Sequence, residues 1–169
     1  MMGAWRCLAY IAAWGLLCFP LGRLFKRLDL RWDRPPFRTM AWERDGAVYR
    51  RAGIRVWKDL APDVSRMFPG SVPRKTLSKR PTPAVMEDML LETCVAELTH
   101  AMLIVSGAAL LWLWPGVGGI AVYAVYVLLG NVPFIMIQRY NRPRFARLLE
   151  AAKARERRKM NAGSDTVEQ

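Results

Sequence analysis

An uncharged stretch of 38 residues, 101–138, constrains this sequence more than any other feature. As a single helix it would be about 57 Å long, whereas the hydrocarbon core of a bilayer is only about 30 Å thick. The chain must therefore turn within the stretch. Residues 114–119 contain Pro115 and three glycines, which is typical of such a turn. The stretch predicts a transmembrane helical hairpin with arms at 99–114 and 120–137.

A second apolar segment, 7–22, lies near the start of the chain. Its length suits the hydrophobic part of a secretory signal. However, residues 19–22 do not form a small-x-small cleavage site, and a basic cluster at 23–31 follows at once. This order favours an uncleaved first transmembrane helix, with a cleaved signal as the alternative.

The distribution of charge predicts how the segments are oriented. The chain carries 26 basic and 14 acidic residues, and nearly all of them lie in 23–98 and after residue 138. Because positively charged segments stay in the cytoplasm, we expect three membrane segments, with the N-terminus outside and the C-terminus inside. The localisation expected is a bacterial-type plasma membrane, multi-pass, with the catalytic face cytoplasmic. Anionic membrane lipids explain the basic excess, and no nucleic-acid partner is expected because no groove-reading motif is present.

The fold class predicted is an all-α integral membrane protein with a single membrane domain over residues 1–169. Its expected parts are a first transmembrane segment (1–22), a cytoplasmic loop and amphipathic helix (23–98), a transmembrane hairpin (99–138) and a basic cytoplasmic tail (139–169). Within the irregular loop, the segments 46–49 and 53–57 look extended. After Pro143 the tail is expected to form a basic interfacial helix.

The amphipathic helix is expected to begin at Ala84, just after Pro83, with Thr82 as its cap. It should continue into the first arm of the hairpin. On a helical wheel the single histidine, His100, lies about 60° from Glu97 and about 80° from Glu92. The spacing therefore predicts a Glu97–His100 pair at the cytoplasmic membrane boundary.

An antiparallel hairpin would bring His100 level with residues 130–139. Asn131, Gln138 and Arg142 share one helical stripe there. Polar groups at this depth are costly unless they are paired or hydrated, so the cluster predicts a functional site. A histidine beside a carboxylate can act as a general base. Spacing alone equally allows a structural role, in which His100 satisfies polar groups between two helices.

No metal site is expected, since a carboxylate-bridged centre needs a second Glu-x-x-His that this sequence lacks. Two other clusters are candidates for binding phosphate or carboxylate groups. Their members are Trp57, Lys58 and Asp59 in the loop and Arg139, Tyr140, Asn141 and Arg142 after the hairpin. A solvated loop and a positive membrane flank are the alternative readings.

Several of these strings together resemble the glycosyl-diaponeurosporenoate acyltransferases, small membrane enzymes that complete staphyloxanthin-type glyco-carotenoids. The resemblance covers roughly residues 43–158. It rests on Glu92-Thr93, Ala96-Glu97-Leu98, His100, Asn131-Val132-Pro133, the string 138–144, and Trp57-Lys58-Asp59 with Gly53-Ile54 before it and Pro62 after it. Two departures, at Ala101 and Cys94-Val95, lie beside the expected pocket and leave the acceptor open.

The resemblance implies transfer of a fatty acyl group from an acyl thioester, of coenzyme A or of acyl-carrier protein, to a sugar hydroxyl of a membrane glycolipid or glyco-carotenoid. No cofactor is expected. In this hypothesis His100 is the base and Glu97 orients it, with Glu92 as the other nearby carboxylate. Asn131 or Gln138 binds the oxyanion. Arg139 and Arg142, with Lys58, hold the donor's phosphates. The alternative is a non-enzymatic membrane scaffold for a lipid or pigment pathway, and the oligomeric state stays open.

Overall fold

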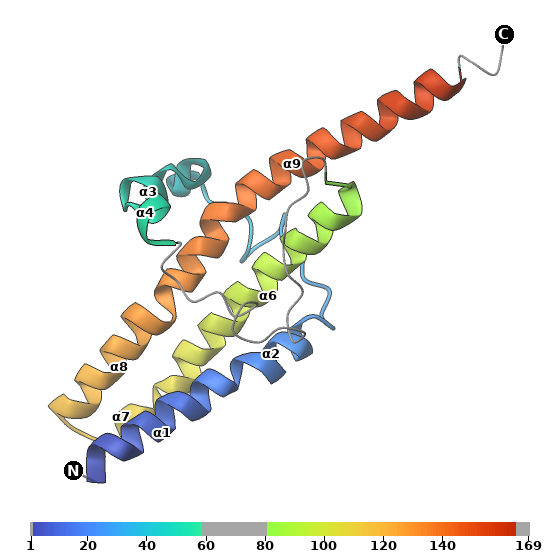
Figure 1. The fold of residues 1–169 in the computed structure, drawn as a ribbon. Helices are drawn as coiled ribbons and strands as arrows, with labels where there is room; N and C mark the ends of the chain where they lie inside the picture. Colours follow the sequence, from blue (N-terminus) through green and yellow to red (C-terminus); the bar gives the residue numbers. More distant parts are fainter. Residues whose placement is uncertain (1, 59–80, 165–169) are drawn as a thin grey trace.

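The computed structural model describes residues 2–58 and 81–164, and these residues form helices joined by turns, without a strand (Figure 1). The predicted all-helical class is confirmed. The elements are α1 (Met2–Leu16), α2 (Cys18–Phe25), the 3-10 helix η1 (Ala41–Gly46), α3 (Ala47–Arg51), α4 (Ile54–Trp57), α6 (Pro83–Gly107), α7 (Ala109–Leu113), α8 (Val117–Gly130) and α9 (Val132–Ser164).

The helix α6 begins at Pro83, one residue before the predicted Ala84, and has the predicted cap. The side chain of Thr82 accepts a hydrogen bond from the backbone N–H of Val85 at 3.4 Å. Pro83 lies in the first turn, where a backbone N–H would have no partner within the helix, so the N–H that proline lacks is not missed. The helical path then continues through α7 into the hairpin. The expected run from the amphipathic helix into the first arm is thus confirmed.

The turn between α7 and α8 falls on the predicted Pro-Gly segment. Gly116 has a φ of +108°, which favours glycine. A Cβ atom on Gly119 would clash with the carbonyl oxygen of Trp114, so only glycine fits at that position. The close approach of the backbone at this point lets the chain reverse within a few residues.

The helices α8 and α9 follow each other with only Asn131 between them. The backbone N–H of Asn131 still donates to the carbonyl of Val127, and that of Ile135 donates to the carbonyl of Asn131. α9 then passes through Pro143 without ending. The prediction of a separate interfacial helix after Pro143 is therefore wrong, because this part of the chain belongs to α9. Buried packing of Leu149 against α6 residues Met89 and Leu90 holds the later turns in line with the earlier ones.

Two stretches of helix are long and apolar enough to cross a membrane, Pro83–Leu113 and Val117–Ala162. Only 11% of the most apolar window of the second is buried inside the protein. The core helix of a water-soluble protein would be covered, so this uncovered apolar surface fits membrane association. The first apolar helix, Ala9–Phe25, is shorter than these two.

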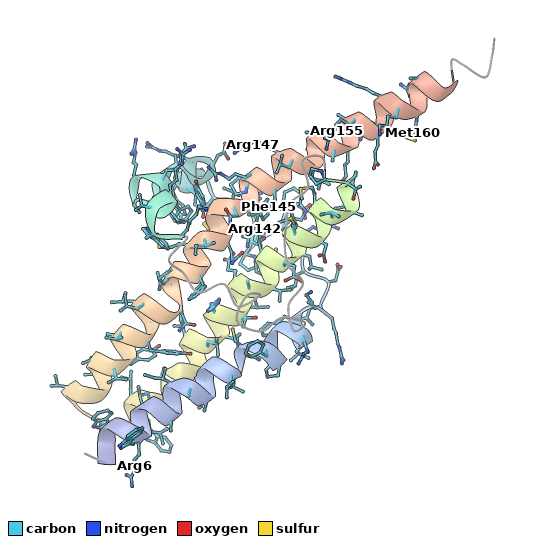
Figure 2. The ribbon with its side chains drawn as sticks, viewed as in Figure 1. Arg6, Arg142, Phe145, Arg147, Arg155 and Met160 are labelled. Carbon is cyan, nitrogen blue, oxygen red and sulfur yellow. The ribbon has the colours of Figure 1, made fainter. Side chains whose placement is uncertain are left out.

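The N-terminal helices lie along α6 and α7 (Figure 1). The hydroxyl of Tyr10 donates to the carbonyl of Gly107 at 2.8 Å, and the indole of Trp14 donates to the hydroxyl of Ser106 at 3.0 Å. Figure 2 shows Arg6 at the end of the bundle that carries the α7–α8 turn, whereas Arg147 and Arg155 lie toward the other end.

Residues 41–57 form three short helices, η1, α3 and α4, which we call the 41–57 module. In Figure 1 it lies beside α9, on the other side of that helix from α1 and α2. The prediction that residues 46–49 and 53–57 are extended is therefore wrong. Gly46 and Gly53, with φ of +83° and +72°, reverse the chain before α3 and α4, and burial of Tyr49 and Ile54 against α9 outweighs their preference for strands.

Candidate functional site

The first polar cluster is centred on His100, where α6 passes the junction of α8 and α9. Nδ1 of His100 lies 3.0 Å from Oδ1 of Asn131, and the imidazole stacks on the ring of Phe134 with centroids 4.7 Å apart. The prediction that His100 is level with residues 130–139 is confirmed.

The hydrogen bonds of Asn131 determine which nitrogen of His100 carries the proton. The amide nitrogen of Asn131 donates to the carbonyl of Tyr126 at 3.0 Å, so its amide oxygen faces His100. An amide oxygen can only accept, and Nδ1 must therefore be the protonated nitrogen of the neutral ring. Nε2 is left with a free lone pair, which is the form needed to accept a proton.

The second polar cluster surrounds Arg142, which is 1% exposed and lies between α9 and α6 (Figure 2). Its guanidinium donates to Glu97 Oε2 at 2.6 Å and to the carbonyl of Phe37 at 2.6 Å. It also donates to the hydroxyl of Thr93 at 3.0 Å and to the carbonyl of Thr93 at 3.1 Å. Arg142 thus joins α9 and α6 to the loop that precedes η1.

Arg139 extends this cluster to the 41–57 module. Its guanidinium lies 2.7 Å from Glu97 Oε1 and 3.2 Å from Glu43 Oε1, and it donates to the carbonyl of Pro36 at 2.9 Å. Glu43 also accepts from the hydroxyl of Tyr49 at 2.5 Å. Burial and the neighbouring Glu43 carboxylate raise the pKa of Tyr49, which keeps the phenol neutral and able to donate.

The structure corrects the predicted Glu97–His100 pair. Both oxygens of Glu97 accept from guanidinium groups, one from Arg139 and one from Arg142, while His100 pairs with Asn131. A buried carboxylate is stable only beside opposite charge. The two arginines of α9 meet that need, and a neutral imidazole would not.

The phosphate-binding role expected for Arg139 and Arg142 stays a prediction, and the structure shows which protein groups their guanidiniums already contact. Nε and both terminal nitrogens of the Arg142 guanidinium already donate to the protein. Arg139 is engaged by two carboxylates and one carbonyl. An incoming phosphate would have to displace these ion pairs, which join α9, α6 and the 41–57 module.

Three other predicted residues lie close to these clusters. Gln138 is half-buried, and its side chain makes no hydrogen bond within the part of the chain that the structure describes. Glu92 pairs with Lys26 of the segment after α2, away from His100. Tyr140 is buried under the guanidinium of Arg144, and its hydroxyl has no hydrogen-bond partner among the residues that the structure describes.

The remaining predicted residues are spread over two places. Trp57 donates from its indole to the carbonyl of Ala52 at 3.0 Å and packs against the cluster of Tyr49, Ile54 and Tyr140. Lys58 caps the end of α4 and is half-buried, and Asn141 is half-buried on α9. Asp59 lies outside the described residues.

The sequence reasoning missed Glu43 and Tyr49 as members of the polar cluster. Glu43 is 1% exposed and bonds to Arg139, 96 residues further along the chain. No spacing rule links residues so far apart. The one local signal is the position of Glu43 three residues after Met40, whose backbone N–H it accepts at 2.6 Å, as in a helix-capping box.

Comparison with known proteins places this geometry in context. The model of the glycosyl-4,4'-diaponeurosporenoate acyltransferase family matches residues 33–151, a range that includes both polar clusters. A curated protein of that name from Staphylococcus aureus (strain N315) is 30% identical over 126 residues, which is 70% of this chain and 71% of the relative. No solved structure matches the chain significantly.

Proposed function

Because this chain is an acyltransferase that belongs to the glycosyl-4,4'-diaponeurosporenoate acyltransferase family, we propose that it moves a fatty acyl group from an acyl thioester to a sugar hydroxyl of a membrane glycolipid. The acceptor proposed first is a glycosylated carotenoid, which is the substrate class in the relative's name. Membership of an acyltransferase family favours the enzyme over the non-enzymatic scaffold.

The observation that carries the mechanism is the 3.0 Å contact between Nδ1 of His100 and Oδ1 of Asn131, from which the tautomer follows. Nε2 of the neutral ring takes the proton from the acceptor hydroxyl as the oxygen attacks the thioester carbonyl. A carbon–oxygen bond forms, the carbon–sulfur bond breaks, and the imidazolium returns the proton to the leaving thiolate. Asn131 holds Nδ1–H throughout and so keeps Nε2 directed at the substrate.

Gln138 is the better of the two proposed oxyanion partners. The amide nitrogen of Asn131 already donates to the carbonyl of Tyr126, whereas the amide of Gln138 has no partner among the described residues. Gln138 lies four residues after Phe134, on the same face of α9 that packs on His100. A donor at that point can stabilise the charge that develops on the thioester oxygen.

A direct transfer suits the described residues better than an acyl-enzyme. Cys94 is fully buried, and burial makes a thiol a poor nucleophile because it disfavours the thiolate. The uncovered apolar faces of α8 and α9 offer a surface for the acyl chain and the lipid tail of the acceptor. Binding of both tails beside His100 would bring the reacting atoms together.

We propose a multi-pass arrangement with the two polar clusters at the cytoplasmic boundary. The hairpin and the N-terminal helix would then span or enter the membrane together, with Arg6 and the α7–α8 turn at the outer side (Figure 2). The hydrogen bonds of Tyr10 and Trp14 to α6 support retention of the N-terminal helix. The mass of the protein purified from membranes would show whether residues 1–22 are present.

The proposed reaction is tested by reconstituting the purified protein in lipid nanodiscs. Labelled acyl-coenzyme A and labelled acyl-carrier protein are supplied separately, each with a glycosylated carotenoid or a bacterial glycolipid extract. We expect a product whose mass equals that of acceptor plus fatty acid minus water, and the donor that supports it identifies the thioester class. Empty nanodiscs are the control. If protein-containing nanodiscs form no more product than empty ones with either donor and either acceptor, the proposal is contradicted.

Asn131 is expected to act as a positioning residue. Replacement by leucine, which has a similar volume but no acceptor, leaves Nδ1 of His100 unpaired and lets the ring adopt the wrong tautomer. We expect kcat to fall about tenfold or more with a smaller change in KM, because the defect lies in base catalysis rather than in binding. Asn131→Asp, which keeps an acceptor, should retain more activity.

Thr99→Val is the matched control for this prediction. Thr99 is buried next to His100, and among the described residues its hydroxyl bonds only to the carbonyl of Val95 in its own helix. Its kcat should match that of the wild type. Equal kcat for Asn131→Leu and Thr99→Val would refute the positioning role.

A further inference from the structure

The 41–57 module carries a group of exposed arginines. Arg44, Arg50, Arg51 and Arg55 are all exposed, and none of them pairs with a carboxylate of another described residue. The single exposed acidic residue of the module is Asp45, since Glu43 is buried against Arg139. The outer surface of the module is therefore strongly positive.

Large apolar side chains lie among these arginines. Val56 is 79% exposed and follows Arg55 directly, and Trp42 is 56% exposed two residues before Arg44. In a water-soluble module such side chains would usually be turned inward. Exposed tryptophan beside positive charge is instead typical of a surface that rests on the headgroup layer of a membrane.

The packing of the module sets its depth relative to the bilayer. Tyr49 and Ile54 pack with Tyr140, and Trp57 together with Met136 and Ile137 lies against that cluster. Met136 and Ile137 are among the last residues of the uncharged stretch that ends at Gln138. The module is thus held where the apolar surface of α9 stops and its charged surface begins.

We propose that the 41–57 module docks onto anionic phospholipid headgroups, an inference that rests on the membrane placement proposed above. Each arginine near a negatively charged leaflet gains attraction that decays within a Debye length of about 10 Å. Trp42 and Val56 enter the headgroup layer between the arginines. A small phosphate ligand such as coenzyme A would call for an enclosing pocket, and these arginines are instead spread over an exposed surface.

The far part of α9 provides a matched control surface. Arg157, Arg158 and Lys159 are also exposed and have no carboxylate partner among the described residues. They lie 18 to 20 residues after Arg139, which places them about 27–30 Å further along the helix axis. Figure 1 shows this part of α9 projecting beyond the start of α6. Anionic lipid at the level of the module would barely reach these charges.

The proposal is tested with the full-length protein in a neutral detergent. Brominated phosphatidylglycerol or brominated phosphatidylcholine is titrated in, and quenching of Trp42 is obtained as the difference between the wild type and Trp42→Phe. We expect half-maximal quenching at a much lower mole fraction of phosphatidylglycerol than of phosphatidylcholine. The variant R50Q/R51Q/R55Q should need about tenfold more phosphatidylglycerol, since each lost charge removes part of the attraction.

The control R157Q/R158Q/K159Q has the same change of charge and should behave like the wild type. R50K/R51K/R55K, which keeps the charge, should restore quenching and excludes a simple folding defect. Equal quenching by both lipids, or an equal effect of the two neutralised variants, would overturn the proposal. So would displacement of brominated phosphatidylglycerol by micromolar coenzyme A, because the arginines would then be a donor-binding site.

Discussion

Replacing His100 by alanine is expected to lower the rate of acyl transfer by roughly a hundredfold to ten-thousandfold. The acceptor hydroxyl keeps its proton near neutral pH and attacks a thioester poorly unless a base removes that proton as the bond forms. In the proposed mechanism Nε2 of His100 is the base, because Asn131 Oδ1 holds the proton on Nδ1. Product formation by protein reconstituted in nanodiscs, quantified by mass spectrometry at saturating donor, measures the effect.

A second variant separates catalysis from folding. His100→Gln keeps a polar side chain that can hydrogen-bond to Asn131 but cannot take up a proton near neutral pH. It should melt at nearly the same temperature as the wild type and still lose activity. If either variant folds normally and transfers acyl groups at the wild-type rate, His100 is not the base.

Replacing Glu97 by glutamine is expected to destabilise the protein by about 3–5 kcal/mol. Glu97 neutralises Arg142, which is 1% exposed, and shares the charge of Arg139 with Glu43. Glutamine has nearly the same shape but no charge, and its amide group would turn donors toward guanidinium groups that also donate. A buried positive charge without compensation is the source of the loss. Thermal unfolding in detergent, followed by loss of helical circular dichroism, measures it.

Glu87→Gln is the matched control for this substitution. Glu87 pairs with Lys153 at 2.9 Å, but the two side chains are 55% and 37% exposed, so solvent screens the pair. The same chemical change should therefore cost at most about 1 kcal/mol. A similar loss of stability in the two variants would show that the Glu97 cluster contributes no more than a surface ion pair.

The sequence by itself determined the helical hairpin and the level of His100. A long uncharged stretch must turn to fit a bilayer, and the glycines with Pro115 leave one place for the turn. With the turn placed, two antiparallel arms of similar length bring His100 opposite Asn131, as the structure shows. The start of α6 could also be predicted from the sequence, because Thr82 and Pro83 act on backbone groups only a few residues away.

Local patterns misled where packing decides the conformation. Residues 46–49 and 53–57 are predicted to be extended, yet they lie in helices and turns because Tyr49 and Ile54 are buried against Tyr140. The sequence also predicts a separate interfacial helix after Pro143. Burial of Leu149 and the four bonds of Arg142 keep α9 continuous across it.

Only the tertiary structure decided which polar groups pair. A helical wheel gives the angle between Glu97 and His100 on their own helix, but not the side chains that face them from α9. There Glu97 meets Arg139 and Arg142, and Glu43 joins them from a distant part of the chain. A buried carboxylate selects the nearest positive charge, because attraction between opposite charges must offset the loss of water. Asn131 is thereby left as the partner of His100, and by accepting from Nδ1 it leaves Nε2 as the basic nitrogen.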